Sequence, residues 1–398
     1  MKINFLHITF FVAIIIFGFS FSNKKFSDPN KEKLLIEVVK YVVEKGHYNS
    51  IMIDDDISEK IFDSYIEQLD AQKRFFLQSD IRQFEKYKYK LDDQLKDYDL
   101  TFFDLVFQTS RERIDEVKDY YYDIMENGFD FSSNESIDLD FENKSFARSK
   151  NEIKNRWRKQ LKYSTLDILT LKLGDSIKII DNETLDESMS LIKKNTEDFF
   201  DYIGEMDRDD WFANYINAFL NQLDPHTVYF NPDDKDRFDT NISGKFNGIG
   251  ARLQKTEGAV KIVDIIVGGP IWKDKLLDVG DIILKVAQEN EDPVDIIGMK
   301  LDDAIKLIKG PADSVVKLTV KKIDGEIKDV SIKRGLVELE ELYAKSTLIS
   351  KDNKNYGYIS LPKFYVDFSD KNSRNSANDV KNEIIKTLTH QVFHYQLF

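Results

Sequence analysis

Two kinds of hydrophobic pattern follow one another along the chain. Between residues 30 and 224, apolar residues recur every three or four positions, as on one face of a helix. No proline interrupts this stretch, and proline breaks helices. Between residues 240 and 340, apolar residues instead form short runs bounded by glycines, which is typical of strands and turns. The pattern therefore predicts a helical N-terminal region followed by a strand-rich region.

The helical pattern separates into several segments. Apolar stripes predict helices over residues 34–46, 57–69, 81–95 and 103–124. Asp56 and Glu59 have the spacing of a capping box and predict the start of the second helix. Gly46 and Gly128 predict the ends of the first and fourth helices. We expect the many aromatic side chains of this region to fill its core.

The strand-rich region contains four predicted strands and a short helical segment. Alternating or continuous apolar runs predict strands over residues 260–267, 280–286, 315–320 and 327–332. Asp324 and Gly325 predict a hairpin turn between the last two strands. A short helical face over residues 301–308 is closed by Gly310 and Pro311. Together these elements predict a compact domain of strands with two short helices.

Composition narrows the class of protein. The chain has 398 residues and a mass of 46.5 kDa, which predicts two to four domains at roughly 100–200 residues each. Its formal net charge of −14 disfavours a nucleic-acid partner, because such binding needs a basic surface. The absence of cysteine excludes disulfides, thiolate metal sites and a cysteine nucleophile.

The first residues have the features of an export signal. Lys2 is followed by an uncharged run over residues 8–21, which is shorter than the ~20 residues of a membrane span. Ser20 and Ser22 flank a small-x-small cleavage site. We therefore predict a signal peptide over residues 1–22 and a periplasmic or cell-envelope location. An uncleaved anchor is the alternative, and it would provide the chain's membrane contact.

A glycine-containing loop precedes the first predicted strand of the strand-rich region. In residues 248–251, two glycines surround Ile249, so that successive N–H groups can point to one side and bind an anion such as a terminal carboxylate. The strand that follows offers an edge to which an extended peptide can add. A plain hairpin turn is the alternative interpretation. A nucleotide site is disfavoured, because the loop opens a strand and not a helix.

An ordered set of motifs resembles one known family. The motifs are LDPHT at residues 223–227, GIGA at 248–251, VGGP at 267–270, VGD at 279–281, IKGP at 308–311 and GYISLPKFY at 357–365. This set resembles the carboxy-terminal processing peptidases, serine peptidase family S41, and within them the tail-specific protease branch. Leu69-Asp70 followed by Phe75-Phe76-Leu77 is similar to the same branch. The resemblance covers roughly residues 35–385.

The resemblance implies a multidomain α+β protein. Its parts would be an all-α N-terminal domain over residues 31–225, a PDZ domain over 240–338 and the start of an α/β peptidase core over 340–398. It also implies proteolysis of exported proteins that are chosen by their C-terminal tails, without a cofactor or metal. The tail's carboxylate would bind Gly248, Ile249, Gly250 and Ala251, and its last side chain would enter a pocket between Leu253, Leu301 and Ile305.

The family's serine–lysine dyad has no counterpart in the sequence. Two pairs have the spacing S-x-x-K, but Ser22 with Lys25 lies at the cleavage site and Ser360 with Lys363 lies in a strand. We therefore assign no catalytic residue and expect the peptidase core to be truncated. Asp224 with His226 is interpreted as a helix-ending turn, and His390 with His394 as an off-pattern tail and not a zinc site.

Two functional hypotheses remain open at this point. The first is a tail-specific serine protease whose chain is an inactive fragment, a hydrolase by descent. The second is a non-catalytic secreted PDZ protein that captures C-terminal peptides. A third class, the trypsin-like heat-shock proteases, requires a double β-barrel before the PDZ domain. The proline-free helical stretch argues against that class.

Overall fold

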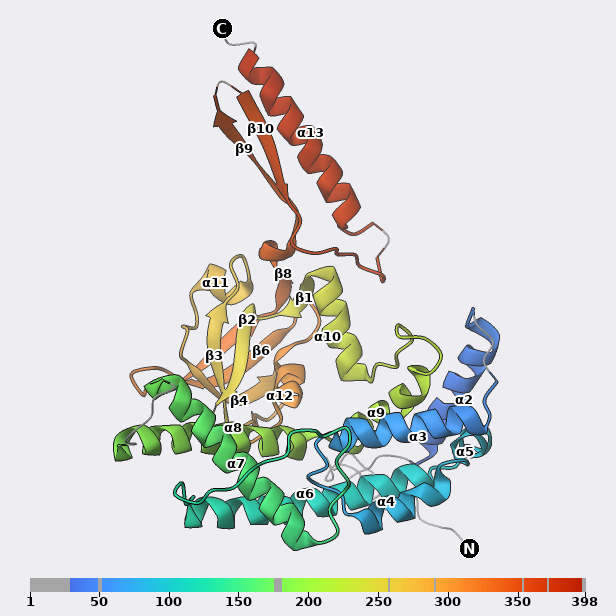
Figure 1. The fold of residues 1–398 in the computed structure, drawn as a ribbon. Coiled ribbons are helices and arrows are strands. Elements are labelled where there is room, and N and C mark those ends of the chain that lie inside the picture. The colour runs from blue at the N-terminus through green and yellow to red at the C-terminus, as the bar shows by residue number, and fades with distance from the viewer. Residues whose placement is uncertain are drawn as a thin grey trace, which may run out of the picture. The chain divides into compact units, whose positions relative to one another are not determined.

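The computed structural model divides the chain into two compact units, residues 1–229 and residues 230–398 (Figure 1). It describes residues 29–48, 52–174, 181–256, 258–289, 291–352, 354–370 and 372–395. The predicted signal peptide lies outside these residues. No helix among the described residues is both long and apolar enough to span a membrane.

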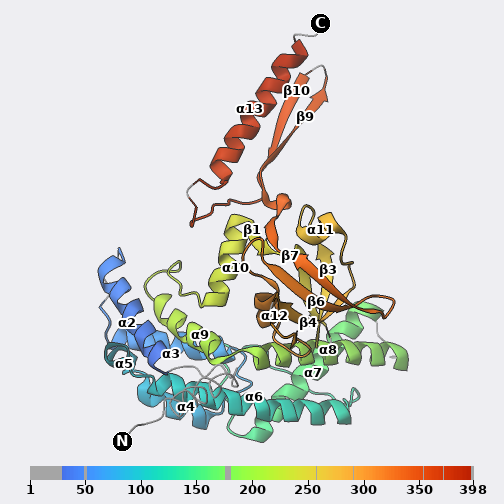
Figure 2. The same cartoon turned by 180° about the vertical axis from the view of Figure 1, so that it is seen from behind.

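The N-terminal unit is helical in the residues that the structure describes, as the sequence pattern predicts. Its elements are α2 (Pro29–Gly46), α3 (Asp55–Asp70), α4 (Gln78–Phe84), η1 (Glu85–Tyr87), α5 (Leu91–Asp97), α6 (Thr101–Asn127), α7 (Lys150–Leu173), α8 (Asn182–Glu205) and α9 (Arg208–Leu220). Helix α7 packs against both α6 and α8 (Figures 1 and 2). Gly128 ends α6 with a φ of +69°, a conformation that glycine adopts without strain.

Two predicted details of the helices are wrong. The residue that caps α3 is Asp54, whose Oδ1 accepts the N–H of Ile57 at 3.3 Å, and Asp56 lies inside the first turn. The predicted helix over residues 81–95 is broken into α4, η1 and α5. Ser58 explains the break, because its hydroxyl donates to the Lys88 carbonyl at 2.8 Å and accepts the Leu91 N–H at 2.7 Å.

Aromatic side chains fill the core of the N-terminal unit, as expected. One cluster joins α3, α6 and α9, and in it the rings of Tyr65 and Tyr215 lie edge to face with centroids 5.3 Å apart. A second cluster joins α6, α7 and α8, where Trp157 stacks on Phe200 with centroids 5.7 Å apart. Such pairs add about 0.5–1.5 kcal/mol each beyond the burial of their area.

The C-terminal unit contains the strands. They are β1 (Lys245–Gly248), β2 (Ala251–Thr256), β3 (Ala259–Ile265), β4 (Ile282–Gln288), β5 (Val294–Asp295), β6 (Val315–Lys321), β7 (Ile327–Lys333), β8 (Gly335–Glu338), β9 (Lys345–Lys351) and β10 (Lys354–Ser360). One antiparallel sheet has the order β2-β3-β4-β6-β7, with β5 paired to β4. Strand β2 is therefore an edge strand among the described strands. Two further antiparallel pairs are β1 with β8 and β9 with β10.

Short helices accompany these strands. They are α10 (Pro232–Ser243), α11 (Pro270–Asp274), α12 (Leu301–Ile308), η2 (Glu340–Leu342) and α13 (Ser376–Tyr395). Helix α12 contacts β2 and β4, and α13 runs alongside the hairpin of β9 and β10 (Figures 1 and 2). Because α13 continues to Tyr395, the sequence after residue 388 remains helical. The structure groups residues 230–398 into one unit, so a boundary near residue 340 stays a prediction.

Candidate peptide-binding site

The glycine-containing loop of residues 248–251 joins β1 to the edge strand β2. Gly248 pairs with Gly335 of β8, and Ala251 pairs with Ile265 of β3, so that both ends of the loop are fixed by strand pairing. The loop therefore lies at the start of the one sheet edge to which an extended peptide could add beside α12. This arrangement agrees with the order of elements that the sequence predicts.

Hydrogen bonds fix the carbonyl groups of the loop and leave its amides open. The N–H of Ile271 donates to the Ile249 carbonyl at 3.1 Å, and the N–H of Ile266 donates to the Gly250 carbonyl at 2.9 Å. Among the described residues, the N–H groups of Ile249 and Gly250 donate to no acceptor. Unpaired amides of this kind are rare in the interior, and both residues are buried. These two amides are therefore available to an acceptor, and their role in binding a carboxylate stays a prediction.

Glycine is required at the centre of this loop. Gly250 has a φ of +85°, in the left-handed region that other residues avoid. A Cβ on Gly250 would also lie 3.0 Å from the Cα of Gly269. The loop and the β3–α11 connection therefore approach each other so closely that a side chain on Gly250 would force the backbone to shift.

The predicted apolar pocket residues lie on the two elements that border the edge. Leu253 is on β2, Leu301 and Ile305 are on α12, and all three side chains are half-buried. Leu253 and Leu301 pack against the core of the sheet. Because α12 contacts β2, the structure brings the predicted residues to one side of the sheet. Their role in holding a side chain stays a prediction.

Arg334 positions α12, and the sequence analysis did not identify it. This buried guanidinium donates from Nε to the Ile308 carbonyl at 2.8 Å and from Nη2 to the Leu307 carbonyl at 3.0 Å. Nη2 also donates to Gln288 Oε1 at 2.7 Å. Burial lowers the pKa of Arg334. Only the folded chain brings residue 334 to the end of α12, so spacing in the sequence carries no signal for this contact.

A second feature that the sequence missed is a cavity of about 750 Å³ beside β1. It is lined by residues of α10, by Lys309 at the end of α12 and by residues 366–369, and none of the seven predicted site residues lines it. The Lys309 ammonium lies 5.3 Å from the centre of the Phe246 ring. Lys309 also lies next to Gly248, where its Cγ would be 3.8 Å from an added Cβ. A positive charge therefore lies close to the start of the loop.

Two serine–lysine contacts occur among the described residues, and in both the lysine is also paired with a carboxylate. Lys245 Nζ lies 2.7 Å from Ser373 Oγ and 2.7 Å from Asp367 Oδ2. The hydrogen bond from Lys245 holds the pKa of Asp367 well below its usual range. Lys162 contacts Ser133 at 2.9 Å and is likewise paired with Glu135, at 2.7 Å. Since a general base must be neutral, neither lysine is placed to activate its serine.

The carboxylate of the LDPHT motif lies in the turn after α9 and contacts a histidine that is distant in the sequence. Asp224 Oδ1 accepts the backbone N–H of His226 at 2.7 Å, while Oδ2 accepts from the Thr227 hydroxyl at 2.5 Å and lies 2.7 Å from His47 Nε2. These hydrogen bonds, first that from Thr227, hold the pKa of Asp224 below its usual range. The helix-ending turn predicted from the sequence is present. The imidazole that contacts Asp224 is that of His47, which the sequence analysis did not single out.

The remaining candidate pairs form no site in the described residues. Lys363 Nζ donates to the Asn241 carbonyl, and no hydrogen bond joins it to Ser360. Ser22 and Lys25 lie outside the described residues, as do the side chains of His390 and His394 on α13. The described His, Asp and Glu side chains form no group of three that could hold a metal ion.

Comparisons with known proteins first define the class of domain. A family profile described as PDZ domain matches residues 240–321, and one described as tail specific protease N-terminal domain matches residues 38–233. The order of strands, the edge strand β2 and the loop at its start thus belong to a PDZ domain. A solved PDZ domain of a carboxy-terminal protease from Vibrio cholerae, in complex with peptide, is 43% identical. The match covers 24% of this chain and 99% of that chain with a TM-score of 0.23.

Relatives that match longer parts of the chain define the family. The tail-specific protease of Haemophilus influenzae is 30% identical over 344 residues, which are 86% of this chain and 47% of that protein. The carboxy-terminal processing protease CtpA of Bacillus subtilis is 32% identical over 165 residues, which are 41% of this chain and 33% of that protein. The chain belongs to the carboxy-terminal processing protease family. It spans about half the length of the tail-specific relative and about a third of the length of CtpA.

Proposed function

We propose that this chain captures the C-terminal tails of substrate proteins in its PDZ domain and thereby selects them for a tail-specific protease. The observation that carries the proposal is the pair of unpaired, buried amides at Ile249 and Gly250, at the start of the edge strand β2. A terminal carboxylate supplies the acceptor that these amides lack, and the tail behind it can extend along β2.

Energetic estimates support modest affinity. Charge-assisted hydrogen bonds to the carboxylate contribute roughly 1.5–3 kcal/mol each. Full burial of one apolar side chain beside Leu253, Leu301 and Ile305 adds about 1.5–3 kcal/mol. Ordering a flexible tail opposes these terms, so a dissociation constant on the order of micromolar is expected.

Charge also favours an anionic tail at this site. The chain as a whole carries a formal net charge of −14, which would repel a carboxylate at a distance. The side chain of Lys309 passes the loop at Gly248, and its ammonium lies 5.3 Å from the centre of the Phe246 ring. This cation provides local attraction that a generally acidic surface lacks.

Cleavage is not part of what we propose for residues 1–398. In both serine–lysine contacts in the described residues, the lysine is ion-paired with a carboxylate, so neither lysine provides a neutral base. The inactive-fragment hypothesis and the hypothesis of a non-catalytic PDZ protein share tail capture as their first step. They differ in whether a catalytic core acts after capture, and a cleavage assay separates them.

We place this activity outside the cytoplasm, in the periplasm or cell envelope. The uncharged run over residues 8–21 behind Lys2 supports an export signal, and the substrates would then be exported proteins. Fusion of residues 1–30 to a reporter that is active only after export tests this placement directly. Export of the reporter is expected, and retention in the cytoplasm would contradict it.

The proposal of tail capture is tested at residue level by nuclear magnetic resonance. Selective ¹⁵N labelling of isoleucine and glycine in the full chain reports on Ile249 and Gly250. Addition of a peptide with a free apolar C-terminus should shift these two amide signals downfield, because each gains a charged acceptor. Shifts confined to other parts of the chain would place the peptide elsewhere and contradict the proposal.

A further inference from the structure

Arg74 in the N-terminal unit carries a charge that no described side chain neutralises by contact. Its guanidinium carbon lies 4.4 Å from the centre of the Trp157 ring and 5.1 Å from that of Phe199. Among the described residues, it makes neither a side-chain hydrogen bond nor an ion pair. Burial lowers the pKa of Arg74, and the charge of Asp70 partly opposes this effect. Five N–H donors are therefore held between aromatic rings without an acceptor.

The Arg74 side chain lines two cavities. One has a volume of about 370 Å³ and the other about 320 Å³, and both are lined by Gln72 and Arg74. The volumes lie in the range of roughly 300–1,000 Å³ that ligand sites occupy. The first cavity is mainly apolar, and its lining includes Leu69, Phe75, Ile114, Phe199, Ile203 and Trp211.

The second cavity is cationic. Arg74, Lys144, Arg156 and Lys159 line it together with two carboxylates, those of Asp138 and Glu152. Lys144 donates to the Asp138 carbonyl at 2.8 Å and Lys159 to the Ser136 carbonyl at 2.8 Å, so neither ammonium has a carboxylate partner in these contacts. Arg156 is paired with Glu152 at 2.6 Å. The excess of cations contrasts with the net charge of −14 of the whole chain.

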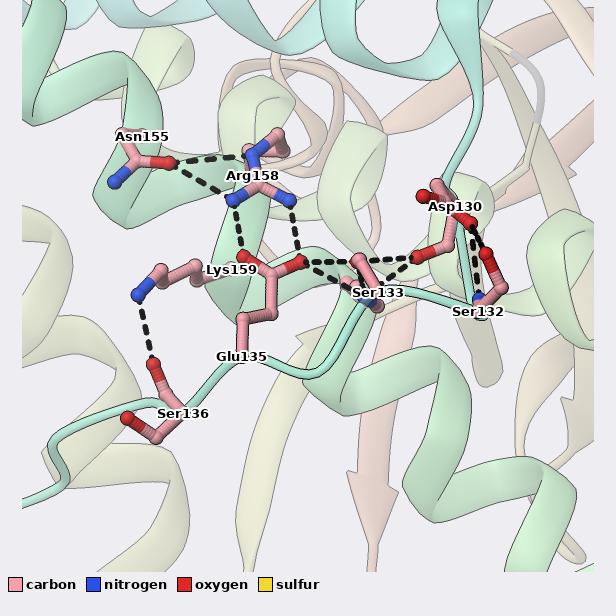
Figure 3. Close-up of polar contacts among 9 residues, drawn as sticks. Asp130, Ser132, Ser133, Glu135, Ser136, Asn155, Arg158 and Lys159 are labelled. Atoms are coloured by element: carbon pink, nitrogen blue, oxygen red, sulfur yellow. Dashed lines mark hydrogen bonds and ion pairs between the residues drawn. The ribbon is translucent and has the colours of Figure 1, made fainter.

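Hydrogen bonds fix the wall of this second cavity. Glu135, in the connection between α6 and α7, receives two bonds from Arg158, at 2.9 Å and 2.5 Å (Figure 3). It also receives one bond from Lys162, at 2.7 Å. Figure 3 also shows Lys159 of α7 reaching the carbonyl of Ser136 in the same connection. The connection is thereby held against α7 at several points. The bonds of Lys144 and Lys159 to carbonyls of this connection hold both of these lining cations in place, which reduces the entropic cost of binding.

We propose that this part of the N-terminal unit binds a small amphiphilic carboxylate, with its carboxylate on Arg74 and its apolar body in the first cavity. A guanidinium and a carboxylate match in two parallel hydrogen bonds, which gives Arg an advantage over Lys here. The lining of Phe75, Phe199 and Trp211 excludes water from the apolar body. Asp70, which also lines the first cavity, does not satisfy Arg74, because its oxygens accept the backbone N–H groups of residues 74–76.

Decanoate is the probe, and decanol is its matched control with the same chain length and no charge. Each is titrated calorimetrically into the full chain below the concentration at which decanoate forms micelles. Decanoate should bind with one-to-one stoichiometry and at least tenfold more tightly than decanol. Arg74→Met keeps the apolar stem and should reduce decanoate affinity at least tenfold, while binding of decanol stays unchanged.

Arg82→Met, at an exposed arginine of α4, is the matched control variant and should bind decanoate as the unmodified chain does. If Arg74→Met does not fold, Lys144→Gln combined with Lys159→Gln provides the test, with an expected loss of at least threefold. Equal binding of decanoate and decanol, or decanoate affinity that is unaffected by Arg74→Met, would overturn the proposal. Binding of many decanoate molecules per chain would overturn it as well.

Discussion

Gly250 and Gly269 face each other backbone to backbone: a Cβ on Gly250 would lie 3.0 Å from the Cα of Gly269. The contact joins the loop before β2 to the connection before α11. It allows the N–H of Ile266 to reach the Gly250 carbonyl at 2.9 Å. The N–H groups of Ile249 and Gly250 donate to no acceptor among the described residues. The two glycines thus shape the site that we assign to the tail's carboxylate.

Substitution of Gly250 should therefore abolish selective tail binding. Gly250→Val introduces a branched side chain where both the positive φ and the contact with Gly269 forbid it. We expect peptides with a free C-terminus and with a C-terminal amide to bind this variant equally weakly. Gly258→Ala is the control, because Gly258 also has a positive φ, of +77°, but no atom lies within 4 Å of its added Cβ. A Gly250→Val protein that still prefers the free acid would contradict this role.

Removal of Arg334 should loosen α12 and weaken peptide binding together. Arg334→Met leaves the buried Ile308 carbonyl without its donor, and an unsatisfied buried acceptor costs about 1–3 kcal/mol, whereas the Leu307 carbonyl keeps the bond from Gln288 Nε2 at 3.0 Å. Urea unfolding should show a loss of that order. Lys333→Met is the neighbouring control, since its exposed ion pair with Asp313 should change the free energy of unfolding by less than ~1 kcal/mol. Equal effects of the two substitutions would show that Arg334 does not hold the helix.

The stability of the chain should depend on pH through Asp70. Burial raises the pKa of Asp70 to about 6, against the bonds from three backbone N–H groups that lower it. The folded state thus binds the proton more tightly than the unfolded state, where the pKa is about 3.9. The stabilisation is full below about pH 4 and is lost as the pH rises through about 6, a change of about 3 kcal/mol.

Urea unfolding of the unmodified chain and of Asp70→Asn, at pH values from 4 to 7, measures this change. The difference between their free energies of unfolding should fall as the pH rises, because asparagine does not titrate. Asp97→Asn, at an exposed carboxylate of α5, gives the baseline. A difference that grows with pH would mean that the three N–H bonds outweigh burial and that the pKa is lowered.

The polypeptide of residues 1–398 should not cleave a substrate that carries an apolar C-terminal tail. A serine nucleophile needs a neutral base within hydrogen-bond reach, and the lysines that contact Ser133 and Ser373 are ion-paired. Incubation followed by mass spectrometry should show the intact substrate. Turnover that survives repurification would identify an unrecognised site, and its loss in Ser373→Ala or Ser360→Ala would locate that site.

Local patterns in the sequence were sufficient for much of the fold. The glycine after α6 and the strands β3, β6 and β7 agree with the predictions, because each depends on neighbouring residues alone. The break between η1 and α5 was missed, because it depends on Ser58, which lies 33 positions before Leu91 in the sequence. The cap of α3 was placed two residues late for a different reason, since Asp54, Asp55 and Asp56 all suit a helix start.

In the candidate site, too, local features could be predicted from the sequence and tertiary contacts could not. The loop of residues 248–251 carries its own signal, since two glycines around one apolar residue are visible in the sequence. The residues that support the loop and α12 carry no such signal, because Gly269 and Arg334 reach them only through tertiary packing. His47 and Arg74 were missed for the same reason. Their partners lie 177 residues away at Asp224 and 83 residues away at the Trp157 indole, which donates to the Arg74 carbonyl.

One titration tests the central claim of tail capture most directly. The full chain is titrated calorimetrically with a peptide that ends in free apolar residues, and with the same peptide as its C-terminal amide. We predict a dissociation constant on the order of micromolar for the acid and binding at least tenfold weaker for the amide, because only the acid gives Ile249 and Gly250 a charged acceptor. Equal binding of the two peptides would refute carboxylate capture and leave the loop as an ordinary turn.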